Sequence, residues 1–94
     1  MLSQLPIDLD TVDKETTDKE ILRAGIIAEL DAINFYEQMA AKTKNEDIKK
    51  ILLDIAKEEK THVGEFETML LKLDAEQVEE NVKAEEEIKE LTGE

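Results

Sequence analysis

Three residues of types that bind metal ions interrupt hydrophobic stripes with helical spacing. Glu59 and His62, the only histidine in this chain of 94 residues, stand three positions apart. That spacing places both side chains on one face of a helix. Glu29 holds a comparable position in an earlier segment. Because a carboxylate taken out of water without a partner is strongly destabilised, two carboxylates and an imidazole that face one another would be stabilised by a divalent cation.

The two stripes indicate the helices that must position these ligands. The first contains Leu22, Ile26, Glu29, Ile33, Tyr36 and Ala40, and the second contains Ile48, Leu52, Ile55, Glu59, His62, Phe66, Met69 and Leu73. In both stripes, steps of three and four residues alternate. This alternation is typical of one face of an amphipathic helix.

Local signals mark the limits of the first helix. Residues 1–16 contain Pro6 and no sustained repeat, so we expect a flexible N-terminal tail before a helical domain at 17–94. The segment Thr17-Asp18-Lys19-Glu20 has the form of a capping box, in which the Thr and Glu side chains bond first-turn amides. The first helix is therefore expected to begin there and to end at the polar run 42–47.

Capping residues also mark a second and a third helix. Asn45 is the expected N-cap of the second, which continues to about Leu73. Asp74 offers a cap for a short, acidic third helix, and Gly93 is a suitable stop. Helices joined by a few polar residues commonly lie antiparallel. The sequence predicts an all-α fold, an antiparallel two-helix hairpin plus a short C-terminal helix.

Composition limits the candidate partners. The formal charge of -13 repels phosphate backbones and anionic lipids, so cations are favoured over nucleic acids and membranes. The absence of cysteine excludes disulfides and thiolate metal sites. No run reaches the roughly 20 apolar residues of a membrane span, and we expect a soluble, unexported protein. A chain this short has a limited core of its own, which favours association with other copies.

The expected hairpin brings the three ligands to one level. Glu29 lies about four turns before the loop, and Glu59 and His62 lie about four turns after it. Four-helix di-iron carboxylate proteins use a Glu from each of two helices and a Glu-x-x-His pair from each of the other two. This chain carries half of that set, and a twofold dimer would complete a ferritin-like four-helix bundle. Such a site suits Fe(II) or Mn(II); we expect two ions per dimer, with Glu59 bridging and Glu29 terminal.

Another interpretation needs no metal. A lone histidine on an apolar face is more often a core or rim residue than a ligand. The chain would then be a non-enzymatic acidic helical adaptor in which His62 is incidental. Tyr36, one heptad after Glu29, could direct its hydroxyl to a metal-bound group or pack as an aromatic core residue.

Two segments resemble the encapsulated ferritins, half-length prokaryotic relatives of ferritin and rubrerythrin. They are Ile26–Ala40 (IIAELDAINFYEQMA) and Ile55–Phe66 (IAKEEKTHVGEF), and the resemblance covers roughly residues 18–91. The two stripe glutamates also have the family's separation of 30 positions.

The resemblance implies a site, an activity and an assembly. The site is a ferroxidase centre formed across a dimer by Glu29, Glu59 and His62 of both chains, with Tyr36 beside it. It would oxidise Fe(II) to Fe(III) with dioxygen or peroxide. The assembly is a decameric ring of five dimers in the cytoplasm, inside an encapsulin nanocompartment whose shell stores the mineralised iron. The alternative enzyme is a rubrerythrin-like peroxidase or manganese protein, although the cysteine-ligated iron domain of full rubrerythrins is missing.

The sequence departs from the family pattern in two places. Some members have acidic residues on both sides of the first ligand glutamate, which form an outer metal site, whereas here Ala28 precedes Glu29 and Asp31 follows. Members made as separate cargo end in a shell-targeting extension and others are fused to the shell protein, and Leu91–Glu94 supply neither. The expectation of packaging therefore comes from the resemblance alone.

Overall fold

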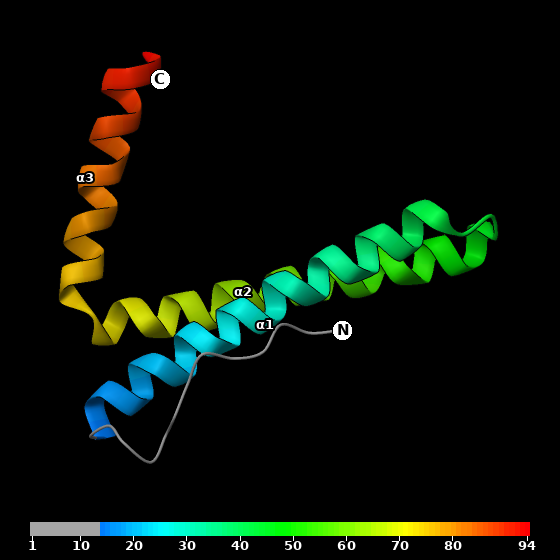
Figure 1. Cartoon of the computed structure of the whole chain (residues 1–94), viewed down its shortest axis with the longest axis horizontal. Coiled ribbons are helices and arrows are strands. Elements are labelled where there is room, and N and C mark those ends of the chain that lie inside the picture. The colour runs from blue at the N-terminus through cyan, green and yellow to red at the C-terminus, as the bar shows by residue number, and fades with distance from the viewer. Residues whose placement is uncertain (1–13) are drawn as a thin grey trace.

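Two long helices form an antiparallel hairpin, and a third helix leaves its open end (Figure 1). The computed structural model describes residues 14–94, in which α1 spans Lys14–Lys42, α2 spans Glu46–Leu73 and α3 spans Ala75–Thr92. The described residues contain no strand. The predicted all-α architecture is therefore confirmed, including the hairpin and the shorter C-terminal helix.

The first helix begins earlier than the sequence signals indicate. Thr17 lies inside α1, which is already helical at Lys14, so the predicted start at a Thr17 capping box is wrong. The residues just before Thr17 include no proline or glycine, and nothing in their backbone chemistry prevents the helix from extending through them. The remainder of the predicted tail, 1–13, lies outside the described residues.

The other helix ends follow the predicted caps. Asn45 Oδ1 accepts hydrogen bonds from the backbone N–H groups of Asp47 at 3.0 Å and Ile48 at 3.1 Å. Asp74 caps α3. Gly93 ends that helix in the left-handed conformation with φ 80°, where its N–H donates to the Lys89 carbonyl at 2.8 Å. These three predictions are confirmed.

Few hydrophobic residues of the described chain are buried, and most of these are alanines. The buried hydrophobic residues are Ala24, Ile33, Ala40, Ala56 and Leu70. Many larger hydrophobic side chains are exposed instead, and they include Ile21, Leu30, Ile48, Ile51, Leu53, Met69, Leu73, Val78, Val82, Ile88 and Leu91. An apolar surface of this extent is unusual for a monomer and typical of an association surface.

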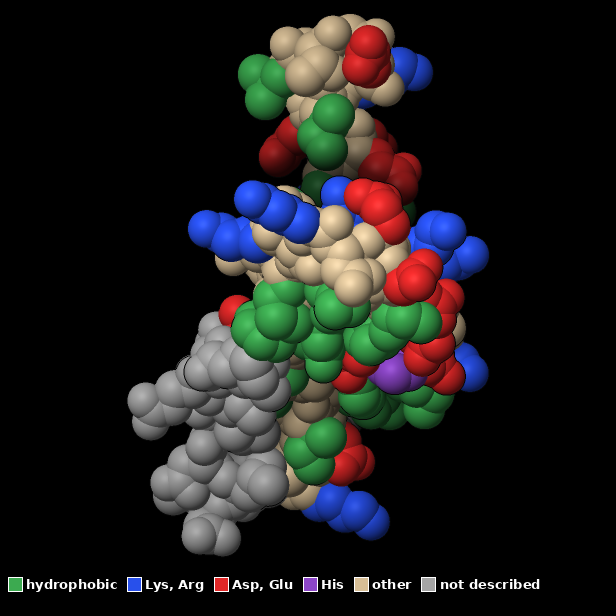
Figure 2. All heavy atoms as spheres, turned by 90° about the vertical axis from the view of Figure 1, so that its right-hand side faces the viewer, with side chains coloured by type: hydrophobic (Ala, Val, Ile, Leu, Met, Phe, Trp, Pro, Cys, Tyr) green, Lys and Arg blue, Asp and Glu red, His purple; other side chains and the backbone are tan. Residues whose placement is uncertain are grey.

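Hydrophobic side chains form a patch on the side of the hairpin that is seen from its loop end. Figure 2 shows this patch, with the single histidine beside acidic side chains at one edge. A groove of about 500 Å³ at the loop end is lined by Phe35, Met39, Ile48 and Leu52, among others. Within residues 14–94, no helix is both long enough and apolar enough to cross a membrane.

A glycine lets an aromatic ring lie against α1 near the acidic residues. A Cβ at Gly25 would stand 3.1 Å from three ring atoms of Phe66, whereas a Cβ at Gly64 would have no neighbour within 4 Å. Both glycines are in helices. They form a matched pair in which only one position is crowded.

We expect alanine to have different effects at these two positions. Alanine stabilises a helix relative to glycine by about 1 kcal/mol, so Gly64→Ala should raise the free energy of unfolding by roughly that amount. Gly25→Ala should gain less or lose stability, because the Phe66 ring must move aside. Thermal unfolding of dilute protein, followed by circular dichroism, measures both. Equal gains at the two positions would contradict the close contact.

Candidate metal centre

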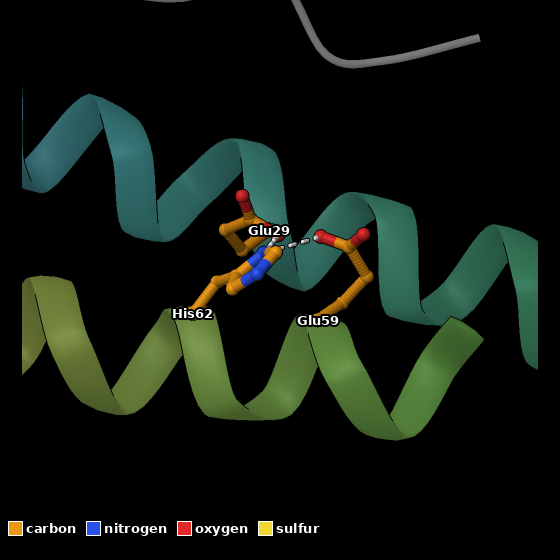
Figure 3. Close-up of side chains that lie close together, drawn as sticks. All are labelled: Glu29, Glu59 and His62. Carbon is orange, nitrogen blue, oxygen red and sulfur yellow. Dashed lines mark hydrogen bonds and ion pairs between the residues drawn. The ribbon is translucent and has the colours of Figure 1, made fainter. Parts of the chain in front are cut away.

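Three side chains converge between the two helices of the hairpin. Glu29 comes from α1 and Glu59 and His62 come from α2, and Figure 3 shows them pointing toward one another. One ligand atom from each lies within 4.8 Å of the others. The antiparallel pairing of α1 and α2 is responsible, because it places a position before the loop opposite a position equally far after it. The convergence expected from the sequence is present.

The three groups cannot satisfy one another by hydrogen bonding. His62 Nδ1 lies 3.3 Å from Glu59 Oε2 and 3.4 Å from Glu29 Oε2. A ring nitrogen carries at most one hydrogen, so it can donate to only one of these oxygens. Glu29 Oε2 is buried and has no hydrogen-bond partner. The cluster has an excess of acceptors and too few donors.

Burial makes this imbalance costly. The side chains of Glu29 and Glu59 are only 19% and 20% exposed, whereas that of His62 is 45% exposed. With a neutral imidazole, the cluster carries two negative charges that are mostly removed from water. Such charges require a counter-charge or further hydrogen bonds. A cation at the meeting point of the three ligand atoms would supply it.

The cluster opens into a groove on one side of the hairpin. The groove has a volume of about 430 Å³ and is lined by Leu22, Glu29, His62, Glu65, Phe66 and Met69. Most of its wall is apolar, and the ligand groups lie at one part of it. Glu65 was not predicted from the sequence to lie here, although its position three residues after His62 continues the spacing from Glu59. That continuation was the signal available for it.

Tyr36 is placed differently from the three ligands. It lies on α1 one heptad after Glu29, and its ring stands edge-to-face against Phe35, with the ring centroids 5.3 Å apart. The Tyr36 side chain is half-buried, and a role of its hydroxyl toward a bound metal stays a prediction.

The donor set can hold a cation but cannot surround it. Two carboxylates and one imidazole provide a mixed oxygen and nitrogen environment, which suits Fe(II) and Mn(II) better than the four tetrahedral ligands of structural zinc. These metals take further ligands beyond three. The open groove leaves room for them beside His62.

Comparison with known proteins places this architecture in a family. The rubrerythrin family model matches residues 20–93. The crystal structure of the encapsulated ferritin domain from Pyrococcus furiosus superposes with a TM-score of 0.86 and 55% sequence identity, and the match covers 100% of this chain and 98% of that one.

Two curated proteins are similar over most of this chain. A ferritin-like-encapsulin shell fusion protein of Pyrococcus furiosus is 65% identical over 74 residues, which cover 79% of this chain and 21% of that protein. The encapsulin nanocompartment cargo protein EncC of Myxococcus xanthus is 42% identical over 69 residues, which cover 70% of this chain and 53% of that protein. The chain thus spans about a fifth of the length of the first relative and about half of the second.

The family assignment agrees with the geometry of the hairpin. The matched family model includes the positions of Glu29, Glu59 and His62, and the structural match extends over all three helices. The chain therefore belongs to the rubrerythrin family of ferritin-like proteins, and within it to the encapsulated ferritins.

Proposed function

We propose that this chain is a ferroxidase that oxidises Fe(II) to Fe(III) at a di-iron site shared by two copies. One observation carries the proposal: Glu29 Oε2 is buried without a hydrogen-bond partner and lies 3.4 Å from His62 Nδ1. An acceptor oxygen held in this way beside an imidazole and a second carboxylate is suited to a metal ion. Membership of the family makes iron the favoured metal.

The number of ligands supports a site shared by two chains. A carboxylate di-iron site in a four-helix bundle uses four glutamates and two histidines, which is twice the set of this hairpin. A twofold axis beside the groove would bring two sets together and would cover exposed apolar side chains such as Met69. Repetition of such dimers as a ring of five is the assembly that the family resemblance implies.

Each ligand has a distinct task in the proposed reaction. Glu59 would bridge the two Fe(II) ions of the pair, Glu29 would bind one ion terminally, and His62 would supply the nitrogen ligand through Nδ1, the ring nitrogen that faces both carboxylates. Bridged ions lie about 3.5–4 Å apart. The two Fe(II) ions lose one electron each, and the two electrons, with two protons, reduce dioxygen to hydrogen peroxide or hydrogen peroxide to two waters.

The oxidised iron is stored in a shell according to this proposal. The relatives include a protein fused to an encapsulin shell and a cargo protein of an encapsulin nanocompartment. We infer that this chain likewise acts inside an encapsulin compartment in the cytoplasm. A formal charge of -13 would help to attract Fe(II) to the ferroxidase.

A peroxidase is the second candidate, because the matched family model is that of rubrerythrin. Both reactions would use the same three ligands and differ in the substrate that is consumed. Turnover with excess Fe(II), and with excess hydrogen peroxide plus an external electron donor, separates them: reduction of many equivalents of peroxide while the bound iron stays constant would favour the peroxidase, and continued oxidation of added Fe(II) the ferroxidase.

The shared site predicts the amount of bound iron. Anaerobic titration with Fe(II) should saturate at about one tightly held ion per chain, because two chains hold two ions. His62→Ala should lose this binding, whereas Glu67→Ala, which removes a charge from an exposed position of α2, should retain it. Elemental analysis after dialysis gives the ratio. Two tightly held ions in each isolated chain would contradict a shared site.

A further inference from the structure

The corner between α2 and α3 contains a buried charge that the proposed ferroxidase does not use. Asp74 is 8% exposed and is the buried charged residue of the described chain. It is the single residue between the end of α2 and the start of α3. A charge buried at such a place normally has strong partners.

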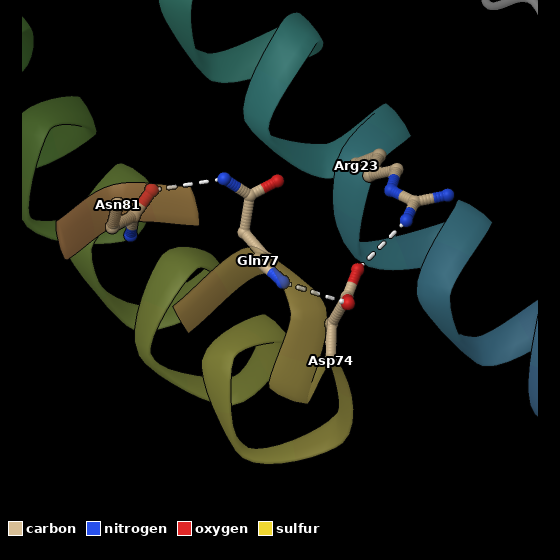
Figure 4. Close-up of polar contacts among 4 residues, drawn as sticks. All are labelled: Arg23, Asp74, Gln77 and Asn81. Carbon is tan, nitrogen blue, oxygen red and sulfur yellow. Dashed lines mark hydrogen bonds and ion pairs between the residues drawn. The ribbon is translucent and has the colours of Figure 1, made fainter. Parts of the chain in front are cut away.

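Asp74 is bonded to all three helices. Its Oδ1 accepts a hydrogen bond from the Gln77 backbone N–H at 3.1 Å, which caps α3. Its backbone N–H donates to the Leu70 carbonyl of α2 at 3.0 Å. Its Oδ2 accepts a hydrogen bond from Arg23 Nη2 of α1 at 2.9 Å (Figure 4). One residue thus links the hairpin to the base of α3.

Little else holds α3 in its direction. It has few contacts with α2, and no Cα atom of α3 lies within 8 Å of one in α1. The hydrophobic residues of α3, Val78, Val82, Ile88 and Leu91, are all exposed. The helix therefore projects from the hairpin as an arm (Figure 1), and its direction depends on the residues at its base.

We propose that the Arg23–Asp74 ion pair is a latch that sets the direction of α3 relative to the hairpin. The cap on Gln77 starts the helix but connects only neighbouring residues, whereas Arg23 ties the same carboxylate to a helix 51 positions away in sequence. The latch is independent of metal binding, since neither residue belongs to the convergent ligand group.

The charges around Asp74 keep the latch closed over a wide pH range. The hydrogen bond from the Gln77 backbone holds the pKa of the Asp74 carboxyl below its ordinary value, the Arg23 hydrogen bond and the nearby Lys19 add to this shift, and burial opposes it. A lowered pKa means that the ionised form is favoured in the folded chain. The latch is therefore closed at neutral pH and opens only in acid, as the pH falls through this lowered pKa.

Distances between spin labels test the latch in the full chain. The sequence has no cysteine, so Asn34→Cys on α1 and Glu90→Cys on α3, both exposed, introduce two unique labelling positions. Position 90 lies about 24 Å along α3 from the corner, so a rotation of about 10° moves it by about 4 Å. Labelled chain is mixed with a large excess of unlabelled chain, which removes distances between copies.

Three variants separate the latch from the cap. Arg23→Met keeps the apolar stem and removes the donor. Asp74→Asn removes the charge and keeps a good N-cap. Arg23→Lys restores a cation. The control is Lys60→Gln. It breaks an exposed ion pair within the hairpin, in which Lys60 Nζ lies 3.0 Å from Glu37 Oε2.

We expect Arg23→Met and Asp74→Asn to broaden or displace the distance distribution by about 4 Å or more, as for a rotation of about 10°. Circular dichroism should show unchanged helix content, Arg23→Lys should recover much of the original distribution, and Lys60→Gln should leave it unchanged. An Arg23→Met distribution identical to that of the parent chain would overturn the proposal, because the direction of α3 would then not depend on the ion pair.

Discussion

Replacing Glu59 by alanine is expected to abolish rapid Fe(II) oxidation, with a loss of more than about a hundredfold in rate. Loss of even an outer-shell partner costs about 10–100-fold in metal affinity or activity, and Glu59 is proposed as the bridge itself. The substitution also removes the oxygen that lies 3.3 Å from His62 Nδ1, so the imidazole loses a neighbour that orients it. Stopped-flow absorbance after mixing Fe(II)-loaded protein with dioxygen measures the rate.

A matched control distinguishes this loss from a general effect of charge. Glu67→Ala removes the same charge from the same helix at an exposed position, and its rate should stay near that of the parent chain. His62→Ala should lose activity as Glu59→Ala does, and both variants should keep their helix content. An unchanged rate in Glu59→Ala would show that this glutamate does not bridge the ions.

Fe(II) is expected to shift dilute protein from monomers to dimers by roughly a hundredfold in the association equilibrium. A ligand at 100 times its dissociation constant stabilises the competent state by about 2.7 kcal/mol. The hairpin alone offers a metal two carboxylates and an imidazole beside an open groove, whereas the proposed dimer would offer twice as many ligands in a closed interface. Native mass spectrometry with and without anaerobic Fe(II) measures the distribution.

Metal-free protein and three variants serve as controls for this measurement. Without metal, four carboxylates would face one another across the proposed interface, and their repulsion should favour monomers at neutral pH. Glu29→Ala and His62→Ala should blunt the response to Fe(II), while Glu67→Ala should preserve it. If metal-loaded monomers accumulate with no increase in dimers, the shared site is ruled out.

Local chemistry explains why much of this architecture could be predicted. The caps at Asn45 and Asp74 and the stop at Gly93 depend on neighbouring residues only, and all three are where the sequence indicates. The convergence of Glu29 with Glu59 needs one further fact, the short loop, because equal distances from a loop place residues opposite each other in a hairpin. The helical spacing of hydrophobic residues, the capping residues and the loop length were sufficient to predict these features.

Contacts between distant residues explain what could not be predicted. The partnership of Arg23 with Asp74 crosses 51 positions and follows from the direction of α3, which no local pattern encodes. The approach of Phe66 to Gly25 likewise depends on how the two helices are rotated against each other. The start of α1 at Lys14 was missed for a different reason, since a capping box at Thr17 is also compatible with a helix interior.

The three-residue connection between α1 and α2 keeps the first steps of folding local. Closing such a short loop takes well under a microsecond and helix growth is similarly fast, so the hairpin can form before the chain meets another copy. Chains that each carry a formal charge of -13 approach one another slowly at low ionic strength. We therefore expect the helices to form first, then the hairpin with its three converging side chains, and the proposed pairing of two copies last, at a rate that depends on concentration and salt.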